Sequence, residues 1–497
     1  MSGTLASRIL GLLRQTLFNR LFSTEITDAF NIAYRVPNLF RELLAEGALS
    51  NSIIPVYKSL EPGERRRFIA SFMSMLVAVN ALIVGLGIIF APQIVGLFQL
   101  SSTLSGHAAA TKVNLDLAIW LTRLMMPFLA GISFSALAMG LLNAEEKFAA
   151  TSFAPLAFNV LTISGFLLFP NQALWLGVFT TLGGFAQLLV QLPSLRQNGL
   201  LPSPTLTWHP GLSRALRLIA PFAFTTSTRQ FLAVILTGLL SSFGAGALTG
   251  FANAEIVFLL VQGLFAISPA TAAYPRLSEF AAAGDWKNFR ETVLGYSRLV
   301  LFLSAGASAL LFALAPSVVS SIFELTGRIA DNKFNPTLAL LPSFALAIAP
   351  WGLVQLLTRA FYARERARDA VTISVIAFIL NTGLYVLLSR FGFVAMNYAT
   401  PITGWLMVGV YVWTLHQQIK LNWKKLVGHT IKVGIAAIAA GLVAWLISSR
   451  IPYSRGVING LLHLSVAGGL GAVVYVAACS VLRVREVEGL RKRILRR

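Results

Sequence analysis

The sequence has little of what soluble enzymes rely on. Its 497 residues include a single cysteine, Cys479, and charged residues make up only 12% of the chain. One cysteine cannot form an internal disulfide or a cysteine metal cluster. We find no Gly-rich phosphate loop with its lysine, no His-Glu-x-x-His pair and no nucleophile elbow. We therefore expect no enzyme, no metal site, no bound cofactor and no direct use of ATP.

What the sequence has in abundance is apolar side chains, which make up 56% of the residues. Apolar stretches near 20 residues recur along the whole chain, and each can cross a hydrocarbon core roughly 30 Å thick. Backbone groups in lipid must be satisfied within the segment, so these stretches predict helices. We predict an all-α membrane protein with about 14 transmembrane helices, near 3–22, 27–56, 69–97, 115–142, 149–169, 172–194, 215–242, 247–274, 295–322, 338–362, 369–389, 393–416, 429–448 and 459–482.

The net charge of +21 could indicate a nucleic-acid partner, but its distribution argues against one. The basic residues concentrate in alternate loops, as in residues 65–67, 364–368 and 424–425, and in the tail 491–497. This is the positive-inside pattern, and it places both termini in the cytoplasm. A second interpretation of the tail is a segment that binds anionic lipid. We expect no removable signal peptide.

An internal repeat with an offset of about 220 residues divides the chain. Four pairs of landmarks recur in the same order: 54–57 with 274–277, 90–95 with 314–319, Pro127 with Pro342, and 143–147 with 362–366. The repeat predicts two pseudo-symmetric six-helix lobes, 1–200 and 201–420, followed by two extra helices and a basic tail in 421–497. An even number of helices in each copy gives a parallel repeat, and such lobes commonly alternate access to a central cavity.

Ionisable residues inside the membrane are costly, so each is a candidate functional residue. The first predicted helix carries Arg8, Arg14 and Arg20. Steps of six residues turn the helix face by roughly 120°, so the three side chains cannot share one stripe. Arg20 is most simply an anchor near the outer end. Arg8 is either a similar anchor or a site residue, whereas Arg14 lies in mid-helix and is the strongest candidate.

The second predicted helix has a polar stripe that runs past Pro37. Asp28 and Arg35 form either a structural ion pair or part of a substrate site. Asn38 is either a substrate ligand or a partner for a carbonyl freed by the proline. Arg41, at the edge of the stripe, favours a substrate contact. Arginine keeps its charge and offers a fork of donors that matches phosphate or pyrophosphate, so the substrate should be an anion.

Other polar positions within predicted helices are fewer. In the fifth helix Asn159 follows Pro155 by one turn, which indicates either a site or a proline kink with its adjacent amide. The second lobe offers Arg229 and Glu255, with Asn381 as a neutral candidate. A cavity that is positive in one lobe and more apolar in the other would fit an amphiphile with an anionic head and a lipid tail.

The segment 28–56, DAFNIAYRVPNLFRELLAEGALSNSIIPV, together with SRILGLLRQ at 7–15, resembles the MurJ (MviN) family of lipid II flippases. The resemblance implies a member of the multidrug/oligosaccharidyl-lipid/polysaccharide exporter superfamily. It also implies that Arg8, Arg14, Asp28, Asn38 and Arg41 match the family's polar positions in the first two helices. Residues 154–159 look like the family's fifth-helix pattern.

The sequence departs from that family in the eighth helix. The family usually has an acid followed by arginine there, and this chain has Glu255 followed by Ile256. Arg229 on the preceding helix could supply the missing charge. The family's sodium site is also incomplete, since Asn381 is present without a partnering mid-helix acid.

We expect a flippase that moves undecaprenyl-pyrophosphate-linked peptidoglycan precursor from the inner to the outer leaflet of the bacterial cytoplasmic membrane. The alternatives are a flippase for another polyprenyl-linked saccharide, a cation-coupled drug exporter of the same superfamily, and a membrane scaffold. The expected partners are lipid II and membrane lipids, without nucleic acid. We expect the protein to function as a monomer that is coupled to the membrane potential or to an ion gradient.

Overall fold

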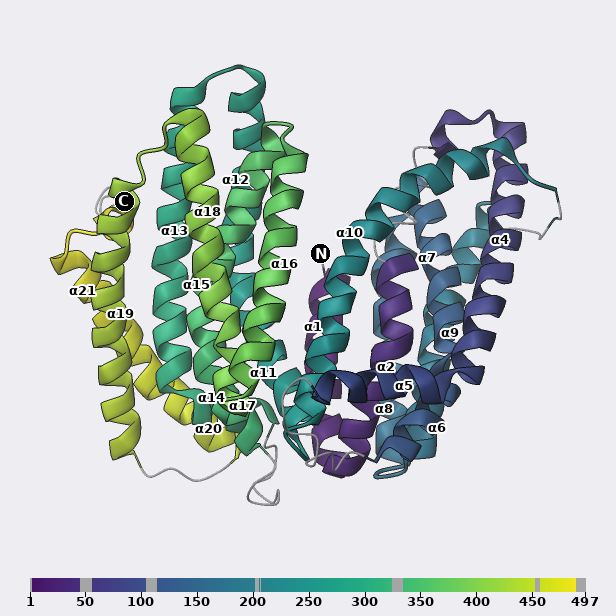
Figure 1. The fold of residues 1–497 in the computed structure, drawn as a ribbon, viewed down its shortest axis with the longest axis horizontal. Helices are drawn as coiled ribbons and strands as arrows, with labels where there is room; N and C mark the ends of the chain where they lie inside the picture. The colour runs from purple at the N-terminus through teal and green to yellow at the C-terminus, as the bar shows by residue number, and fades with distance from the viewer. Residues whose placement is uncertain are drawn as a thin grey trace. The chain divides into compact units, whose positions relative to one another are not determined.

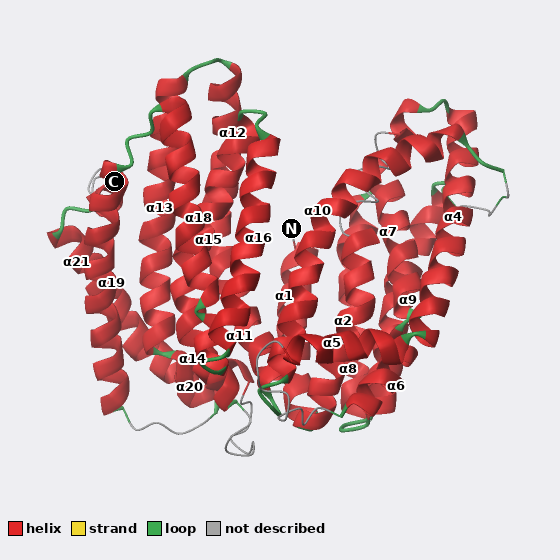
Figure 2. Cartoon of the chain, in the orientation of Figure 1, coloured by secondary structure: helices red, strands yellow, loops and turns green. Residues whose placement is uncertain are grey.

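The computed structural model describes residues 2–44, 56–103, 114–201, 205, 207–323, 334–451 and 456–488. Within these ranges every regular element is a helix, as Figure 2 shows. The predicted all-α fold is therefore confirmed for this part of the chain. The backbone contacts divide the chain into two compact units, Met1–Thr249 and Gly250–Arg497.

The first unit contains α1 to α10 and the start of α11 (Figure 1). The helix α10 packs against α2, α4 and α5, so contacts assign it to this unit, whereas the predicted lobes 1–200 and 201–420 follow the sequence repeat. The helices are α1 (Ser2–Leu21), α2 (Thr24–Leu44), α4 (Pro62–Ile89), α5 (Ala91–Thr103), α6 (Leu115–Met125), α7 (Phe128–Ala144), α8 (Phe148–Leu168), α9 (Ala173–Gln197) and α10 (Pro210–Ser241).

The second unit contains the rest of α11 and all later helices. Two short π-helical turns, η1 and η2, interrupt its long helices. The elements are α11 (Ala247–Gln262), η1 (Gly263–Ile267), α12 (Ser268–Ala282), α13 (Trp286–Ala313), α14 (Ala315–Phe323), α15 (Asn335–Ala363), α16 (Ala367–Ser389), α17 (Phe393–Asn397), α18 (Ala399–Ile419), α19 (Lys424–Arg450), α20 (Val457–His463), η2 (Leu464–Gly468) and α21 (Gly469–Val481).

Eleven helical stretches in the described residues are long and apolar enough to cross a membrane. The helices α1, α2 and α10, which carry Arg14, Arg35 and Arg229, are not among the eleven, because the side chains of each are described only in part. Counting these three as spans gives the predicted fourteen.

Several predicted helix boundaries were wrong, and they were wrong in the same way in both copies of the repeat. The predicted helix 69–97 is α4, which begins at Pro62 and ends at Ile89, and the predicted helix 295–322 is α13, which ends at Ala313. In each case the helix ends, and after one residue a second helix, α5 or α14, begins. Pro92 and Pro316 follow the two breaks directly, and proline is tolerated in the first turn of a helix but not in its interior. Figure 1 shows α5 running across the direction of α4.

The backbone reproduces the repeat at one loop in detail. Glu146, between α7 and α8, has φ 59°, and Glu365, between α15 and α16, has φ 58°. In both loops the next residue donates its N–H to a carbonyl five residues earlier, Lys147 to Leu142 at 2.8 Å and Arg366 to Phe361 at 3.0 Å. A left-handed residue with such a bond closes a helix end. The two copies therefore share the turn that the paired landmarks 143–147 and 362–366 indicated.

Close packing in the first unit depends on glycines where α7 meets α9. A Cβ on Gly131 would lie 2.7 Å from the backbone carbon of Gly184, and a Cβ on Gly184 would lie 2.7 Å from the Phe128 ring. Small residues allow helix backbones to approach in this way, which is the usual means of association in membranes. The main apolar cluster of the unit, which includes Phe68, Phe72 and Leu141, lies beside this contact.

In the second unit, α19 and α21 pack on α13 and form an apolar cluster of their own. Tyr475 of α21 anchors this arrangement, because its hydroxyl donates to the carbonyl of Phe302 and its ring stacks on that of Phe302 at 5.4 Å. Cys479 is fully buried in the same cluster. The single cysteine is thus a packed apolar residue.

We predict that Gly131→Ala destabilises the fold, because the added methyl group overlaps backbone atoms that cannot move independently. Overpacking of this kind costs about 1–3 kcal/mol. Thermal unfolding in detergent is the measurement, and Gly85→Ala in α4 is the control, since its Cβ would meet nothing within 4 Å. Equal melting temperatures for the two variants would contradict the proposed packing.

Candidate substrate-binding site

Arg14 lies on α1 where that helix packs against α8. Its guanidinium lies over the ring of Phe158, 4.9 Å from the ring centre, and the side chain is half-buried. The next residue, Asn159, donates from its amide to the carbonyl of Ser7 on α1 and to that of Pro155, both at 3.2 Å. The amide thus serves the proline turn, as the second interpretation of Asn159 expects, and it also joins two helices. The Pro155 ring itself is exposed.

Asp28 of α2 is 1% exposed and accepts three hydrogen bonds from the segment that begins α11. The donors are the Gly246 N–H at 2.5 Å, the Thr249 N–H at 3.1 Å and the Thr249 hydroxyl at 2.7 Å. Gly246 directly precedes Ala247, the first residue of α11. The carboxylate thus supplies from another helix what an N-cap side chain normally supplies locally. A negative charge there is also favoured by the helix dipole.

Gly246 is a glycine for a conformational reason, because its φ is 85°. Left-handed backbone of this kind is strained for other residues. The turn lets the N–H groups on both sides of Ala247 point at one carboxylate.

Arg35 lies seven residues after Asp28, about 10 Å along the helix. Its Nε donates to the Thr237 hydroxyl of α10 at 3.3 Å. Asn31, between the two, donates to the Thr249 hydroxyl at 3.1 Å. The polar stripe of α2 therefore bonds to two different elements, α10 and the start of α11.

The remaining positions of this unit are placed by their helices. Asn38 is half-buried on α2, and Arg20 is exposed at the end of α1, as expected of an anchor. The side chains of three candidates, Arg8 on α1, Arg41 on α2 and Arg229 on α10, lie outside the described residues.

The second unit has a separate set of buried polar contacts. Glu255 of α11 is half-buried and interacts electrostatically with Tyr385 of α16. The Tyr385 and Thr400 hydroxyls are 2.6 Å apart, and the Thr403 hydroxyl donates to the Asn381 carbonyl oxygen at 3.2 Å. Asn381, predicted as a neutral polar candidate, thus lies in a hydrogen-bonded seam between α16 and α18. The described residues contain no group of three or more His, Cys, Asp or Glu side chains able to hold a metal.

An apolar cavity of about 960 Å³ lies in the second unit. Its walls come from α13, the start of α14, α15, α18 and α19, and Ser308 and Thr430 are the hydroxyl side chains among mostly aliphatic and aromatic ones. Gly434 of α19 lines it, and a Cβ built on Gly434 would meet nothing within 4 Å. The size lies within the range of ligand-binding cavities.

Sequence reasoning missed the partners of the α2 stripe, Thr237, Gly246 and Thr249. The segment Gly244-Ala245-Gly246 before an apolar run does indicate a turn and a helix start. Nothing in the sequence links it to Asp28, however, because more than 200 residues separate the two.

The family model for the lipid II flippase MurJ matches residues 18–462. The chain belongs to the MurJ family of lipid II flippases. The lipid II flippase MurJ of Burkholderia cenocepacia is 29% identical, over 89% of this chain and 88% of that protein. A probable lipid II flippase MurJ of Vibrio cholerae is also 29% identical, over 97% and 94% of the two chains.

Solved structures support the MurJ-family fold. A lipid II flippase MurJ in an inward closed conformation superposes with a TM-score of 0.80 at 21% identity, over 97% of both chains. An inward-facing multidrug transporter of the MATE family gives 0.68 at 13% identity, over 83% of this chain and 94% of that one. The predicted family, superfamily fold and transporter class are confirmed. The chain is a multi-pass protein of the bacterial inner membrane and a transporter rather than an enzyme.

We predict that Asp28→Asn destabilises the first unit, because an amide cannot accept all three hydrogen bonds and carries no charge. A hydrogen bond to a charged group contributes about 1.5–3 kcal/mol, so the loss should be at least of that order. Thermal unfolding in detergent measures it, with Asp116→Asn as the control at an exposed carboxylate on α6. An Asp28→Asn protein as stable as the control would contradict the capping role.

Proposed function

We propose that this protein moves lipid II, the undecaprenyl-pyrophosphate-linked precursor of peptidoglycan, from the inner to the outer leaflet by alternating access. The observation that carries the proposal is the match of the MurJ family model to residues 18–462, in a chain whose first two helices carry arginines. We further propose that both termini are cytoplasmic, as the positive-inside pattern favours.

The head of the substrate is a pyrophosphate, and Arg14 is its best-described ligand. The Phe158 ring holds the guanidinium by a cation–π contact, which is weaker than a charge-assisted bond to phosphate. Arg14 can therefore be held in position when the site is empty and still bind the anion. Arg8 and Arg41 belong to the same proposed clamp through their places on α1 and α2.

The Asp28 contact suggests how the proposed clamp couples to transport. Asp28 bonds Gly246 and Thr249, and the boundary between the two compact units falls directly after Thr249, inside α11. A charge at this point caps the start of α11. We propose that this cap holds one state of the transporter and opens in the other, so that Asp28 is a positioning residue rather than a substrate ligand.

The lipid tail has a natural place in the apolar cavity of the second unit. Transfer from lipid to an apolar cavity gains little hydrophobic free energy, because lipid tails are as apolar as the cavity walls. The gain would come from contact with the walls, as in helix packing within membranes. The cavity would thus orient the chain without holding it too tightly for release.

We propose that the membrane potential acting on the charged head, or an ion gradient, drives transport. We propose a monomer as the functional unit, because one chain contains both lobes of the repeat.

A second candidate is a flippase for another polyprenyl-linked saccharide. Ile256 favours it, because the helix-8 arginine usual in the family is absent at that position. Rescue of a cell depleted of its lipid II flippase separates the two candidates, since a different saccharide flippase would not restore growth.

We predict that Arg14→Ala abolishes this rescue, because one charged contact to pyrophosphate at about 1.5–3 kcal/mol corresponds to roughly 10- to 100-fold in binding. The matched control is Arg20→Ala, which removes the same side chain from the exposed end of the same helix and should still rescue. Growth with Arg14→Ala at a normal protein level would exclude Arg14 from the clamp.

We predict that Gly434→Phe slows flipping several-fold without loss of folding, because its Cβ would meet no atom within 4 Å and the ring would occupy the cavity in the second unit. The control is Gly409→Phe on α18, whose Cβ also meets no atom within 4 Å but which does not line the cavity. The assay is flipping of labelled lipid II in vesicles. Equal rates for the two variants would show that the tail does not use the cavity.

A further inference from the structure

The internal repeat places the same two elements side by side in each unit: the start of a long helix, α4 or α13, and the turn with the left-handed glutamate, Glu146 or Glu365. We call this arrangement the joint. In the first unit the joint contains both an acid and a base. The Tyr57 hydroxyl donates to Glu145 Oε1 at 2.7 Å, and Arg65 Nη1 lies 3.9 Å from the same oxygen. The Arg65 guanidinium also lies over the Tyr57 ring at 5.0 Å. Burial, and then the bond to Glu145, raise the pKa of Tyr57 to about 12.

In the second unit the same positions carry different chemistry. Aligning 62–68 with 283–289 places Trp286 where the first unit has Arg65, and the alignment of the two turns places Arg364 where it has Glu145. The Arg364 guanidinium lies 5.5 Å from the Trp286 ring centre. The arginine–carboxylate contact of the first unit is thus replaced in the second by an arginine on an indole ring. The position that corresponds to Glu145 carries no carboxylate.

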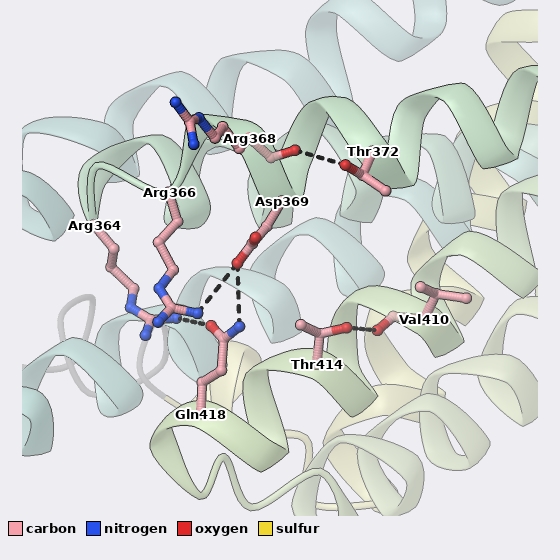
Figure 3. Close-up of polar contacts among 8 residues, drawn as sticks. All are labelled: Arg364, Arg366, Arg368, Asp369, Thr372, Val410, Thr414 and Gln418. Carbon is pink, nitrogen blue, oxygen red and sulfur yellow. Dashed lines mark hydrogen bonds and ion pairs between the residues drawn. The ribbon is translucent and has the colours of Figure 1, made fainter.

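Figure 3 shows what surrounds Arg364 instead. Its Nη1 donates to Gln418 Oε1 of α18 at 2.7 Å, and Gln418 Nε2 donates in turn to Asp369 Oδ2 of α16 at 3.2 Å. Arg366 Nη1 donates to the same Asp369 oxygen, also at 3.2 Å. The Arg364 Nε atom is buried and has no hydrogen-bond partner.

The electrostatic balance at this joint favours a further anion. Burial first, and Arg366 second, lower the pKa of Arg364, and Asp369 only partly opposes them. The Arg366–Asp369 pair is 49% and 39% exposed, and exposed pairs of this kind contribute only about 0–1 kcal/mol. A stronger anion could therefore replace Asp369 at Arg366 at little cost.

The surroundings indicate which anion fits. The joint lies where α15 ends and α16 begins, and the first N–H groups of a helix have no partners within it. Two aromatic side chains beside the joint, Trp286 at 40% and Tyr362 at 43%, are exposed, as is usual where a helix leaves the hydrocarbon. Phosphate matches the guanidinium fork, and a lipid would bring its phosphate to this depth.

We propose that Arg364 and Arg366, with Gln418, form a binding site for the phosphate of an anionic phospholipid. The site lies in the second unit, where α15 ends and α16 begins. The leaflet concerned, the inner one, rests on the orientation given under the proposed function. The site lies within the second unit, and it regulates or orients the protein in the bilayer without taking part in the transfer of lipid II.

The experiment uses the full-length protein without lipid II, so that its outcome is independent of flipping. The protein is extracted from vesicles of phosphatidylcholine and phosphatidylglycerol, and the retained lipids are counted by native mass spectrometry. We expect the wild-type protein to retain phosphatidylglycerol preferentially, and Arg364→Gln to reduce that preference about fivefold, the effect of about 1 kcal/mol per charge near the membrane surface. Arg366→Gln, at an exposed position, should act in the same direction without a risk of misfolding.

The matched control is Arg368→Gln. It removes the same charge from the first turn of α16, but Figure 3 shows the Arg368 side chain directed away from Gln418 and Asp369. A general attraction of anionic lipid to the loop would fall equally in the Arg368 and Arg364 variants, and that result would overturn the proposal. So would unchanged retention in both Arg364→Gln and Arg366→Gln.

Inorganic phosphate distinguishes the two sources of the same chemistry. If millimolar phosphate displaces the retained phosphatidylglycerol, the phosphate group alone is recognised, and the site is confirmed as a phosphate site. If phosphate does not displace the lipid, while the variants still lose it, the lipid chains contribute to binding and the site is specific for a whole phospholipid.

Discussion

A polar group surrounded by hydrocarbon must find its partner inside the protein, and the first unit depends on how Asp28 meets this constraint. The carboxylate is 1% exposed and accepts three hydrogen bonds at the start of α11. The two backbone N–H donors, of Gly246 and Thr249, would otherwise be unsatisfied groups at a helix start. One side chain of α2 thereby fixes where α11 begins, and the compact units divide directly afterwards. The polar stripe of α2 is thus a structural tie as much as a site, and Arg35 and Asn31 extend it to α10 and α11.

The two copies of the repeat share backbone conformation at several places but differ in the side chains at those places. The left-handed glutamates, the helix breaks before Pro92 and Pro316 and the helix starts all recur. The side chains at equivalent places do not: the first unit carries arginines in its membrane helices, whereas the second has an apolar cavity and a hydroxyl–amide seam. The same divergence appears at the joint where Glu145 corresponds to Arg364, which turns a balanced contact into a cationic one.

Much of the site was predictable because intramembrane charge is rare. Arg14 and Asp28 could be singled out from their positions alone, and the fourteen helices followed from apolar length. The role of Asp28 could not. As a member of an ion pair or of a substrate site it had a plausible partner seven residues away, whereas its hydrogen bonds go to residues more than 200 positions later. Asn159 was similarly ambiguous until its second bond, to Ser7 of α1, was known.

By itself, the sequence determined the membrane class, the helix count, the repeat and the anionic nature of the substrate, because each follows from local composition or from periodic recurrence. Only the tertiary structure decided which polar residues are tied to which helices, where the helices break, and that the second unit holds a cavity. These depend on contacts between segments far apart in the chain, and no local pattern of residues records such contacts. The intramembrane charges were visible from the start, and their partners became visible only when the chain was folded.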